Sequence, residues 1–496
     1  MPTARALRRA LYFAMVTLGL AGSALAPPAR AANPPQEHAG AQVALSAEQR
    51  AALAALGRTA MRSPGSRPDP GRPAGSDLLP GVDHVVVLML ENHSFDNLFG
   101  MLGRGDGFRL GPGGQPTATN PYPDGRIQHA FHMPTTCQLP ARPSNEWQAS
   151  HNAYDNGRND GFVRTTISPA SSLMVGGVAM GYWTAKDIPF TYSLASVFPV
   201  ADRWFASALA QTDPNRRFLI AGTAAGMTDD IGESAGNAVP DAELATPEPT
   251  IFNELDLYGI SWANYVSGYP TGATPNLFPL TTGPTEAVHH KAFDQFFTDA
   301  ASGTLPAVTL LDPNYGTESQ ENPQNIVVGD ALLAKVVRAL GASRLWGSTL
   351  LVVTYDEGGG YYDHIPPPPA LAPDAVAPMV QPGEQSYDGF ARYGFRVPAV
   401  VVSAYAKRGY VSHALYDHTS ILATIERRWN LPSLSARDAN ANDLSGMLDL
   451  GALARHHPTF PALPALAAPG DSPAAMACSR TGPGTVPPPG SISPGR

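Results

Sequence analysis

Four polar side chains stand just beyond two apolar runs of the chain, residues 85–90 and 350–353. The first pair is Glu91 and Asn92, and the second pair, two residues past its run, is Asp356 and Glu357. Three carboxylates and an amide oxygen at one place would repel each other unless a cation lay between them. The sequence therefore predicts a divalent metal site. Its all-oxygen ligands favour calcium, magnesium or manganese, and zinc stays an alternative if neighbouring histidines join.

The elements that carry these side chains are expected to be buried strands. An apolar run without alternation is typical of a strand covered on both faces, as in a parallel sheet. Ligands of such sheets collect beyond the carboxyl ends of the strands. Further strands expected over 305–312 and 397–403, with helices over 329–340 and 420–429, alternate as in a doubly wound sheet. We therefore predict a three-layer α/β fold, with a mostly parallel central sheet and helices on both faces.

A hydroxyl able to attack phosphorus stands in the run QTDPNRR, residues 211–217. Thr212 before Asp-Pro is a good helix start, because its hydroxyl can cap the helix and proline is tolerated in the first turn. A helix N-terminus also attracts phosphate. From spacing alone two interpretations stay open. Thr212 is an ordinary N-cap, or it faces the metal, ionises and acts as a nucleophile.

Four motifs in order resemble those of the bacterial phospholipase C and acid phosphatase family of phosphoesterases, relatives of alkaline phosphatases. They are ENHSFDNLFG, TDPNRRFLIAGT, TYDEGGGYYDHIPPP and RVPAVVVSAYAKRGYVSHALYDHTSIL. The resemblance covers roughly residues 82–431 and implies an alkaline phosphatase-like fold in which Thr212 is the nucleophile.

The resemblance also implies roles for other side chains. His151, which precedes a Gly-x-x-Asp-Gly-Phe run, would face the phosphate, and His364 would be a general acid or phosphate ligand. Substrate-binding residues would be Asn215, Arg216 and His418. Structural roles stay open as alternatives for all three histidines; His418, for instance, could only tie the last helix to the core. Two positions depart from the family, because Asn322 and Gly358 stand where many members carry histidine, which puts the leaving-group step in doubt.

The ends of the chain are expected to lie outside the catalytic domain, 79–461. Residues 1–31 resemble an export signal, with arginines before a short apolar run and Ala-Arg-Ala at its end, although a membrane anchor is the alternative. Residues 32–78 are expected to be a flexible leader and linker, with a short helix opened by a capping box at Ser46 and Gln49. Residues 462–496 have the composition of a Pro/Gly-rich tail. Cys137 and Cys478, the two cysteines, are compatible with one disulfide in an exported protein.

Charge and motifs together point to an exported enzyme, periplasmic or secreted. Loss of residues 1–31, which hold four arginines and no acid, would take the formal charge from −9 to −13 and argues against nucleic acid as a partner. We expect a metal-dependent phospholipase C that hydrolyses phosphodiesters such as phosphatidylcholine through a threonine nucleophile. The alternatives are an acid phosphatase of phosphomonoesters and a non-catalytic binding protein for phosphate compounds. Expected partners are a phospholipid or small phosphate ester and, transiently, a membrane surface; the sequence does not indicate the oligomeric state.

Overall fold

An eight-stranded sheet forms the centre of the computed structural model, which describes residues 45–138, 143–165, 173–230, 249–268, 273–278, 287–465 and 487–495. The strand order is β12-β6-β11-β10-β1-β9-β7-β8. The bounds are β1 His84–Leu90, β6 Val200–Ala201, β7 Trp262–Val266, β8 His290–Ala292, β9 Val308–Asp312, β10 Thr349–Tyr355, β11 Ala399–Ser403 and β12 Val411–Ser412.

Strand β1 lies in the middle of the sheet, parallel to β9 on one side and to β10 on the other. The expected strands over 85–90, 305–312, 350–353 and 397–403 are all present. Nearly every residue of β1 and β10 is buried, which explains why neither strand shows polar alternation. Strand β11 runs antiparallel to β10, a reversal that the apolar pattern could not reveal.

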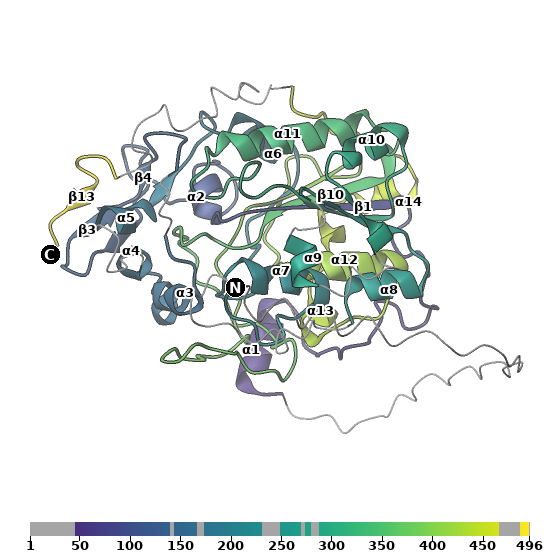
Figure 1. Ribbon diagram of the computed structural model, residues 1–496, viewed down its shortest axis with the longest axis horizontal. Coiled ribbons are helices and arrows are strands. Elements are labelled where there is room, and N and C mark those ends of the chain that lie inside the picture. Colours follow the sequence, from purple (N-terminus) through teal and green to yellow (C-terminus); the bar gives the residue numbers. More distant parts are fainter. Residues whose placement is uncertain are drawn as a thin grey trace, which may run out of the picture. The chain divides into compact units, whose positions relative to one another are not determined.

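Helices cover both faces of the sheet, which confirms the predicted three-layer α/β architecture (Figure 1). One face carries α6 Pro189–Val197, α10 Gln295–Ser302 and α11 Val327–Ala342, and the other carries α7 Thr212–Ala221, α8 Ile251–Leu257 and α12 Thr419–Trp429. Shorter helices are α2 Phe95–Phe99, α9 Ala273–Leu277, α13 Ala436–Asn440 and α14 Leu450–Ala454. Within the described residues, no helix has both the length and the apolar character needed to cross a membrane.

A smaller layer lies beyond the carboxyl ends of β1 and β10, at the left of Figure 1. It contains α3 Trp147–Tyr154, α4 Phe162–Thr165, α5 Leu173–Val178, β2 Thr119–Pro121, β3 Ile127–His129, β4 Phe131–His132, β5 Gly181–Tyr182 and β13 Ile492–Ser493. Strand β13 pairs with β3, so the end of the predicted tail belongs to the fold. Cys137 is disulfide-bonded, whereas Cys478 lies outside the described residues.

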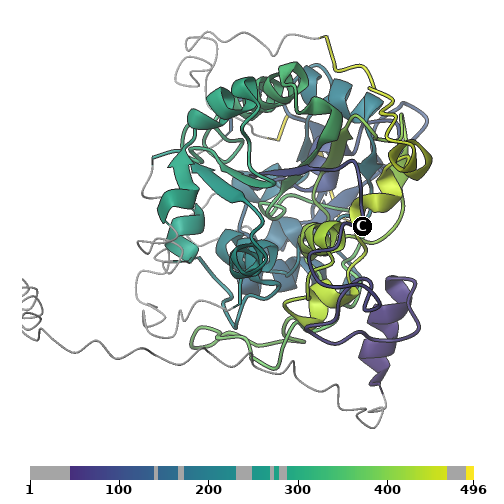
Figure 2. The same cartoon turned by 90° about the vertical axis from the view of Figure 1, so that its right-hand side faces the viewer.

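Residues 45–78 of the predicted leader and linker form an ordered strap, which corrects the expectation that the folded part starts near Leu79; residues 1–44 lie outside the described residues. Helix α1, Ala47–Ala55, opens with the expected capping box at Ser46. The segment after it then runs beside the helices of residues 419–440, as Figure 2 shows for the purple and yellow-green parts of the chain. The amide of Asn430 alone donates to three strap carbonyls, at 2.9, 3.0 and 3.0 Å. A Pro- and Gly-rich composition suits such backbone hydrogen bonding as well as it suits a free linker.

Candidate active site at the carboxyl edge of the sheet

The two predicted ligand pairs lie side by side, because β1 and β10 end together. Leu90 is in register with Tyr355, so that Glu91 and Asp356 leave neighbouring strands at the same level. The backbone N–H of Asn92 donates to Oδ1 of Asp356 at 3.0 Å. Asn92 reaches this position through a φ of 66°, which turns the chain sharply at the sheet edge. The predicted meeting of the two strand ends is therefore confirmed.

Buried negative charge dominates this edge. Glu91 and Glu357 are 4% exposed and Asp356 is fully buried. Burial, followed by repulsion from Asp356, raises the pKa of Glu91 well above its ordinary value, while Arg216 acts in the opposite direction. The guanidinium of Arg216 lies 2.9 Å from Oε1 of Glu91 but 3.7 Å from Oδ2 of Asp356. One arginine thus neutralises only part of the charge.

The oxygens at this edge fit a divalent ion. Oδ2 of Asp356 is buried and has no hydrogen-bond partner among the described residues. Such an orphaned carboxylate oxygen is what an ion would satisfy. The other oxygens here already accept from protein donors. Those of Glu91 accept from Arg216 at 2.9 Å and from the Asn92 amide at 3.0 Å, and Oδ1 of Asn92 accepts from Asn145 at 3.4 Å. Oε1 of Glu357 accepts from Asn145 and its Oε2 from the N–H of Gly359, each at 2.7 Å.

Thr212 lies at the start of α7 and does not cap that helix. The N-cap is Gln211, without a side-chain capping bond, and Thr212 is the first helical residue. This corrects the capping interpretation and leaves the half-buried hydroxyl without that structural task. Side chains four residues apart share one helix face. Thr212 therefore lies on the same face as Arg216, which contacts Glu91 at the sheet edge.

Asn215 and His418, both expected to bind substrate, are fully buried with their polar atoms engaged inside the protein. The Asn215 amide donates to the carbonyls of Ala210 and Gln211 and accepts from the N–H of Ala208, so it shapes the entry to α7. Nε2 of His418 lies 2.6 Å from the carbonyl of Asp356, and its Nδ1 accepts from Trp204 at 3.5 Å. Burial lowers the pKa of His418 to about 4. These contacts hold the start of α7 and the strand end at Asp356 in place.

His364 belongs to a second cluster of acids. Together with Asp96 and Asp363 it forms a group whose ligand atoms lie within 4.8 Å of one another, a spacing that could hold a metal. Arg396, however, already lies 3.2 Å from Asp96 and 2.8 Å from Asp363. Burial opposes the charge of His364, but Asp96, 2.7 Å from its Nδ1, outweighs it and the pKa of His364 is raised. No contact among the described residues joins His364 to Glu91 or Asp356.

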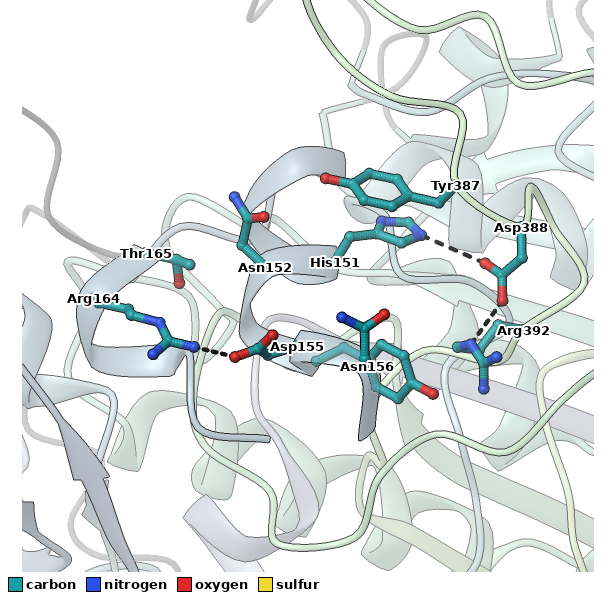
Figure 3. A pocket seen from close by; sticks show the side chains of 10 residues that line it. His151, Asn152, Asp155, Asn156, Arg164, Thr165, Tyr387, Asp388 and Arg392 are labelled. Atoms are coloured by element: carbon teal, nitrogen blue, oxygen red, sulfur yellow. Dashed lines mark hydrogen bonds and ion pairs between the residues drawn. The ribbon is translucent and has the colours of Figure 1, made fainter. Parts of the chain in front are cut away.

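His151 lies on α3 and lines a pocket of about 1000 Å³ (Figure 3). Its Nδ1 lies 2.8 Å from the carbonyl of Trp147, and its ring stacks on Tyr387 at 4.0 Å. Among the described residues, no hydrogen bond or ion pair links it to the four predicted metal ligands. Sequence reasoning missed Tyr387 and Asp388 in this pocket, because they come from a loop more than two hundred residues away.

Sequence reasoning also missed Asn145. Its side-chain amide donates to Glu357 at 2.7 Å and to Oδ1 of Asn92 at 3.4 Å, and it is 2% exposed. The two positions that lack the family histidines, Asn322 and Gly358, have different surroundings. Oδ1 of Asn322 accepts from the hydroxyl of Tyr361 at 3.2 Å. A Cβ at Gly358 would meet its nearest atoms at 3.6 Å or more, so a side chain has room to start there.

A sheet edge with oxygen ligands beside the start of a helix is typical of proteins that bind phosphate esters. Residues 82–432 match the model of the Phosphoesterase family. The chain belongs to this family and is a phosphoric ester hydrolase.

Several relatives of this chain are named phospholipase C. Phospholipase C B of Mycobacterium tuberculosis is 28% identical, over 81% of this chain and 84% of that protein. Non-specific phospholipase C6 of Arabidopsis thaliana is 31% identical, over 72% and 70%. Hemolytic phospholipase C of Pseudomonas aeruginosa is 28% identical, over 74% and 56%. A solved structure of a protein in the alkaline phosphatase superfamily from Vibrio parahaemolyticus is 10% identical, with a TM-score of 0.37 over 78% of this chain and 72% of that one. The fold class rests on the sheet and helices described above.

Proposed function

We propose that this chain is a metal-dependent phosphoesterase of phospholipase C type, which hydrolyses phosphodiesters such as phosphatidylcholine with Thr212 as nucleophile. One observation carries the proposal. Thr212 lies on the face of α7 whose next turn, at Arg216, contacts Glu91, and beside Glu91 the buried Oδ2 of Asp356 has no hydrogen-bond partner among the described residues. The names of the relatives support a phosphodiester substrate.

Each part of the edge has a task in this proposal. Glu91, Asn92 and Asp356 would hold the ion, with Glu357 kept beside them by Asn145. A divalent ion bound there lowers the pKa of an alcohol and stabilises charge on the transferring oxygens. The Thr212 oxygen bonds to phosphorus while the bond from phosphorus to the leaving alcohol breaks, and the hydroxyl proton ends on that alcohol. Water then releases the phosphorylated head group from Thr212.

The test compares p-nitrophenyl phosphorylcholine with p-nitrophenyl phosphate, each with and without chelator. We expect chelator-sensitive cleavage of the diester, and we expect Thr212→Ala to lower kcat at least 10³-fold while leaving the unfolding temperature unchanged. Thr212→Ser, which keeps a hydroxyl, is the matched control and should retain activity. Cleavage of the monoester alone would make the chain an acid phosphatase. Metal binding without any turnover would favour a binding protein instead.

We further propose that the protein is exported, on the strength of the arginine-led apolar run within residues 1–31. Expression in a bacterial host followed by N-terminal sequencing of the mature chain should give Ala32 as the first residue. Recovery of an uncut chain in the membrane fraction would favour the anchor alternative.

A further inference from the structure

The pocket beside His151 contains a buried nitrogen without a partner. His151 is 6% exposed, and its Nε2 makes no hydrogen bond among the described residues. The pocket is lined by residues of α3, of α4 and of a distant loop: His151, Asn152, Tyr154, Asp155, Asn156, Arg164, Thr165, Tyr387, Asp388 and Arg392. In Figure 3 the His151 ring lies under Tyr387 with Nε2 directed at Asp388. A buried polar atom of this kind calls for a ligand or a water.

The geometry shows which ring nitrogen of His151 carries the hydrogen. Nδ1 lies 2.8 Å from the carbonyl oxygen of Trp147, and a carbonyl only accepts, so Nδ1 bears the hydrogen. Burial lowers the pKa of His151 to about 4, which keeps the ring neutral near pH 7. Nε2 is therefore a hydrogen-bond acceptor. In this neutral form Nε2 does not donate to a phosphate oxygen, which is the role that the family resemblance implies.

A second acceptor faces the first across the pocket. Oδ1 of Asp388 lies 4.0 Å from Nε2 of His151, too far for a direct hydrogen bond. The other carboxylate oxygen, Oδ2, is already held by Nε of Arg392 at 2.8 Å. Two acceptors separated by 4.0 Å can both be satisfied by one nitrogen that carries at least two hydrogens, about 2.8–3.0 Å from each.

The pocket is connected to the proposed reaction site through α3. Asn145, just before this helix, contacts Glu357, and the N–H of Trp147 donates to Asp229 at 3.3 Å. The next residue, Asp230, accepts from the N–H of Asp213 beside Thr212 at 2.7 Å. A helical rise of 1.5 Å per residue puts about 6 Å between Trp147, the first residue of α3, and His151 along the axis. Helix α3 and residues 229–230 therefore link the pocket to the start of α7 and to the sheet edge.

We propose that the pocket binds a primary ammonium group, such as that of an ethanolamine head group, between Nε2 of His151 and Oδ1 of Asp388. The inference rests on the proposed function and narrows its substrate class. A quaternary ammonium such as choline has no hydrogen to donate, so the buried Nε2 of His151 would stay unpaired, whereas the exposed Asp388 is open to solvent. Leaving a buried acceptor unpaired costs enough to change affinity by about tenfold to a hundredfold.

The test measures kcat/KM for p-nitrophenyl phosphorylethanolamine and for p-nitrophenyl phosphorylcholine. We expect the wild type to prefer the ethanolamine ester by about tenfold or more. Asp388→Asn and His151→Phe should each bring the ratio close to one, mainly by slowing the ethanolamine ester. Asn152→Ala, which alters the same pocket without touching either acceptor, is the control and should keep the ratio. Unfolding temperatures of all variants show whether a loss is a folding defect.

Outcomes separate this inference from the proposed function. Equal cleavage of both esters by the wild type, or an unchanged ratio in both acceptor variants, would mean that the space holds only water and would overturn the inference alone. If neither ester is cleaved, the proposed function fails. Calorimetry with phosphorylethanolamine and phosphorylcholine then decides the inference: tighter binding of phosphorylethanolamine, lost in Asp388→Asn, supports it, and equal or absent binding overturns it.

Discussion

Two clusters of buried acids lie close together in the chain, and each contains one arginine. At the sheet edge, Arg216 contacts Glu91 at 2.9 Å but stays 3.7 Å from Oδ2 of Asp356. In the second cluster, Arg396 donates to both oxygens of Asp363, at 2.8 and 3.0 Å, and also reaches Asp96. The second cluster has the closer spacing of ligand atoms. Spacing alone would therefore select the second cluster as the metal centre.

The hydrogen bonds of the two clusters favour the opposite assignment, with the metal at the sheet edge. Both oxygens of Asp96 and of Asp363 have partners, from Arg396, His364 and backbone N–H groups. At the sheet edge, Oδ2 of Asp356 and Nε of Arg216 are buried without a hydrogen-bond partner among the described residues and lie 3.7 Å apart. Because buried polar groups are normally paired, the open cluster is suited to bind something and the closed cluster to hold the fold.

The largest effect on stability should come from opening the closed cluster. Asp363→Asn removes a charge that Arg396 faces in a fully buried place, so we expect the free energy of unfolding to fall by about 3–5 kcal/mol. Urea unfolding measures the loss. Asp124→Asn breaks an exposed pair with Arg126 and should leave the free energy of unfolding nearly unchanged. A variant that loses bound metal while remaining stable would make the second cluster the metal centre.

Asp356→Asn should show the reverse pattern. The variant keeps the shape of the side chain and can still accept from Asn92, so stability should change little. Removing the carboxylate charge should lower turnover by about 10²- to 10³-fold, the scale of losing one electrostatic stabiliser, and should lower the metal content as well. Metal analysis by plasma mass spectrometry and kinetics on the diester substrate check both. Full metal content with full activity would show that the ion lies elsewhere.

Asn145→Leu tests the donor that connects the two halves of the sheet edge. Loss of the 2.7 Å bond to Glu357 should weaken metal binding by about 10- to 100-fold, as for other residues that orient a ligand. Titration with Mn²⁺ measures the change in Kd. Ser150→Ala, which removes a hydroxyl bonded to the carbonyl of Asn145, should have a smaller effect. An unchanged Kd in both variants would separate Glu357 from the metal site.

Some features of the fold and the site could be predicted from the sequence, and others could not. Residues 85–90 predict β1 and the ligands after it because a long apolar run has one common explanation and parallel strands end at one edge. The direction of β11 was not predictable, since an apolar run reads the same either way. Contacts of Asn145 and Asp388 depend on loops that meet only in the folded chain, so no local pattern marks them. The strap was missed because its composition is equally that of a linker.

Glu426 sharpens the comparison, because it also has a buried carboxylate oxygen, Oε1, without a partner among the described residues. Here a proton satisfies the group, because burial first, and then Asp438, raises the pKa of Glu426 well above the ordinary 4.5. The folded state thus keeps a proton that the unfolded state releases above pH 4.5, and stability falls as the pH rises from 4.5 toward the raised pKa. Glu426→Gln removes this dependence, so its unfolding temperature should match the wild type at pH 4 and exceed it by about 1–2 °C at pH 8. A difference that is the same at both pH values would mean that Glu426 is ionised in the folded protein. A buried carboxylate oxygen without a hydrogen-bond partner, such as Oδ2 of Asp356, would then be weaker evidence for a metal site.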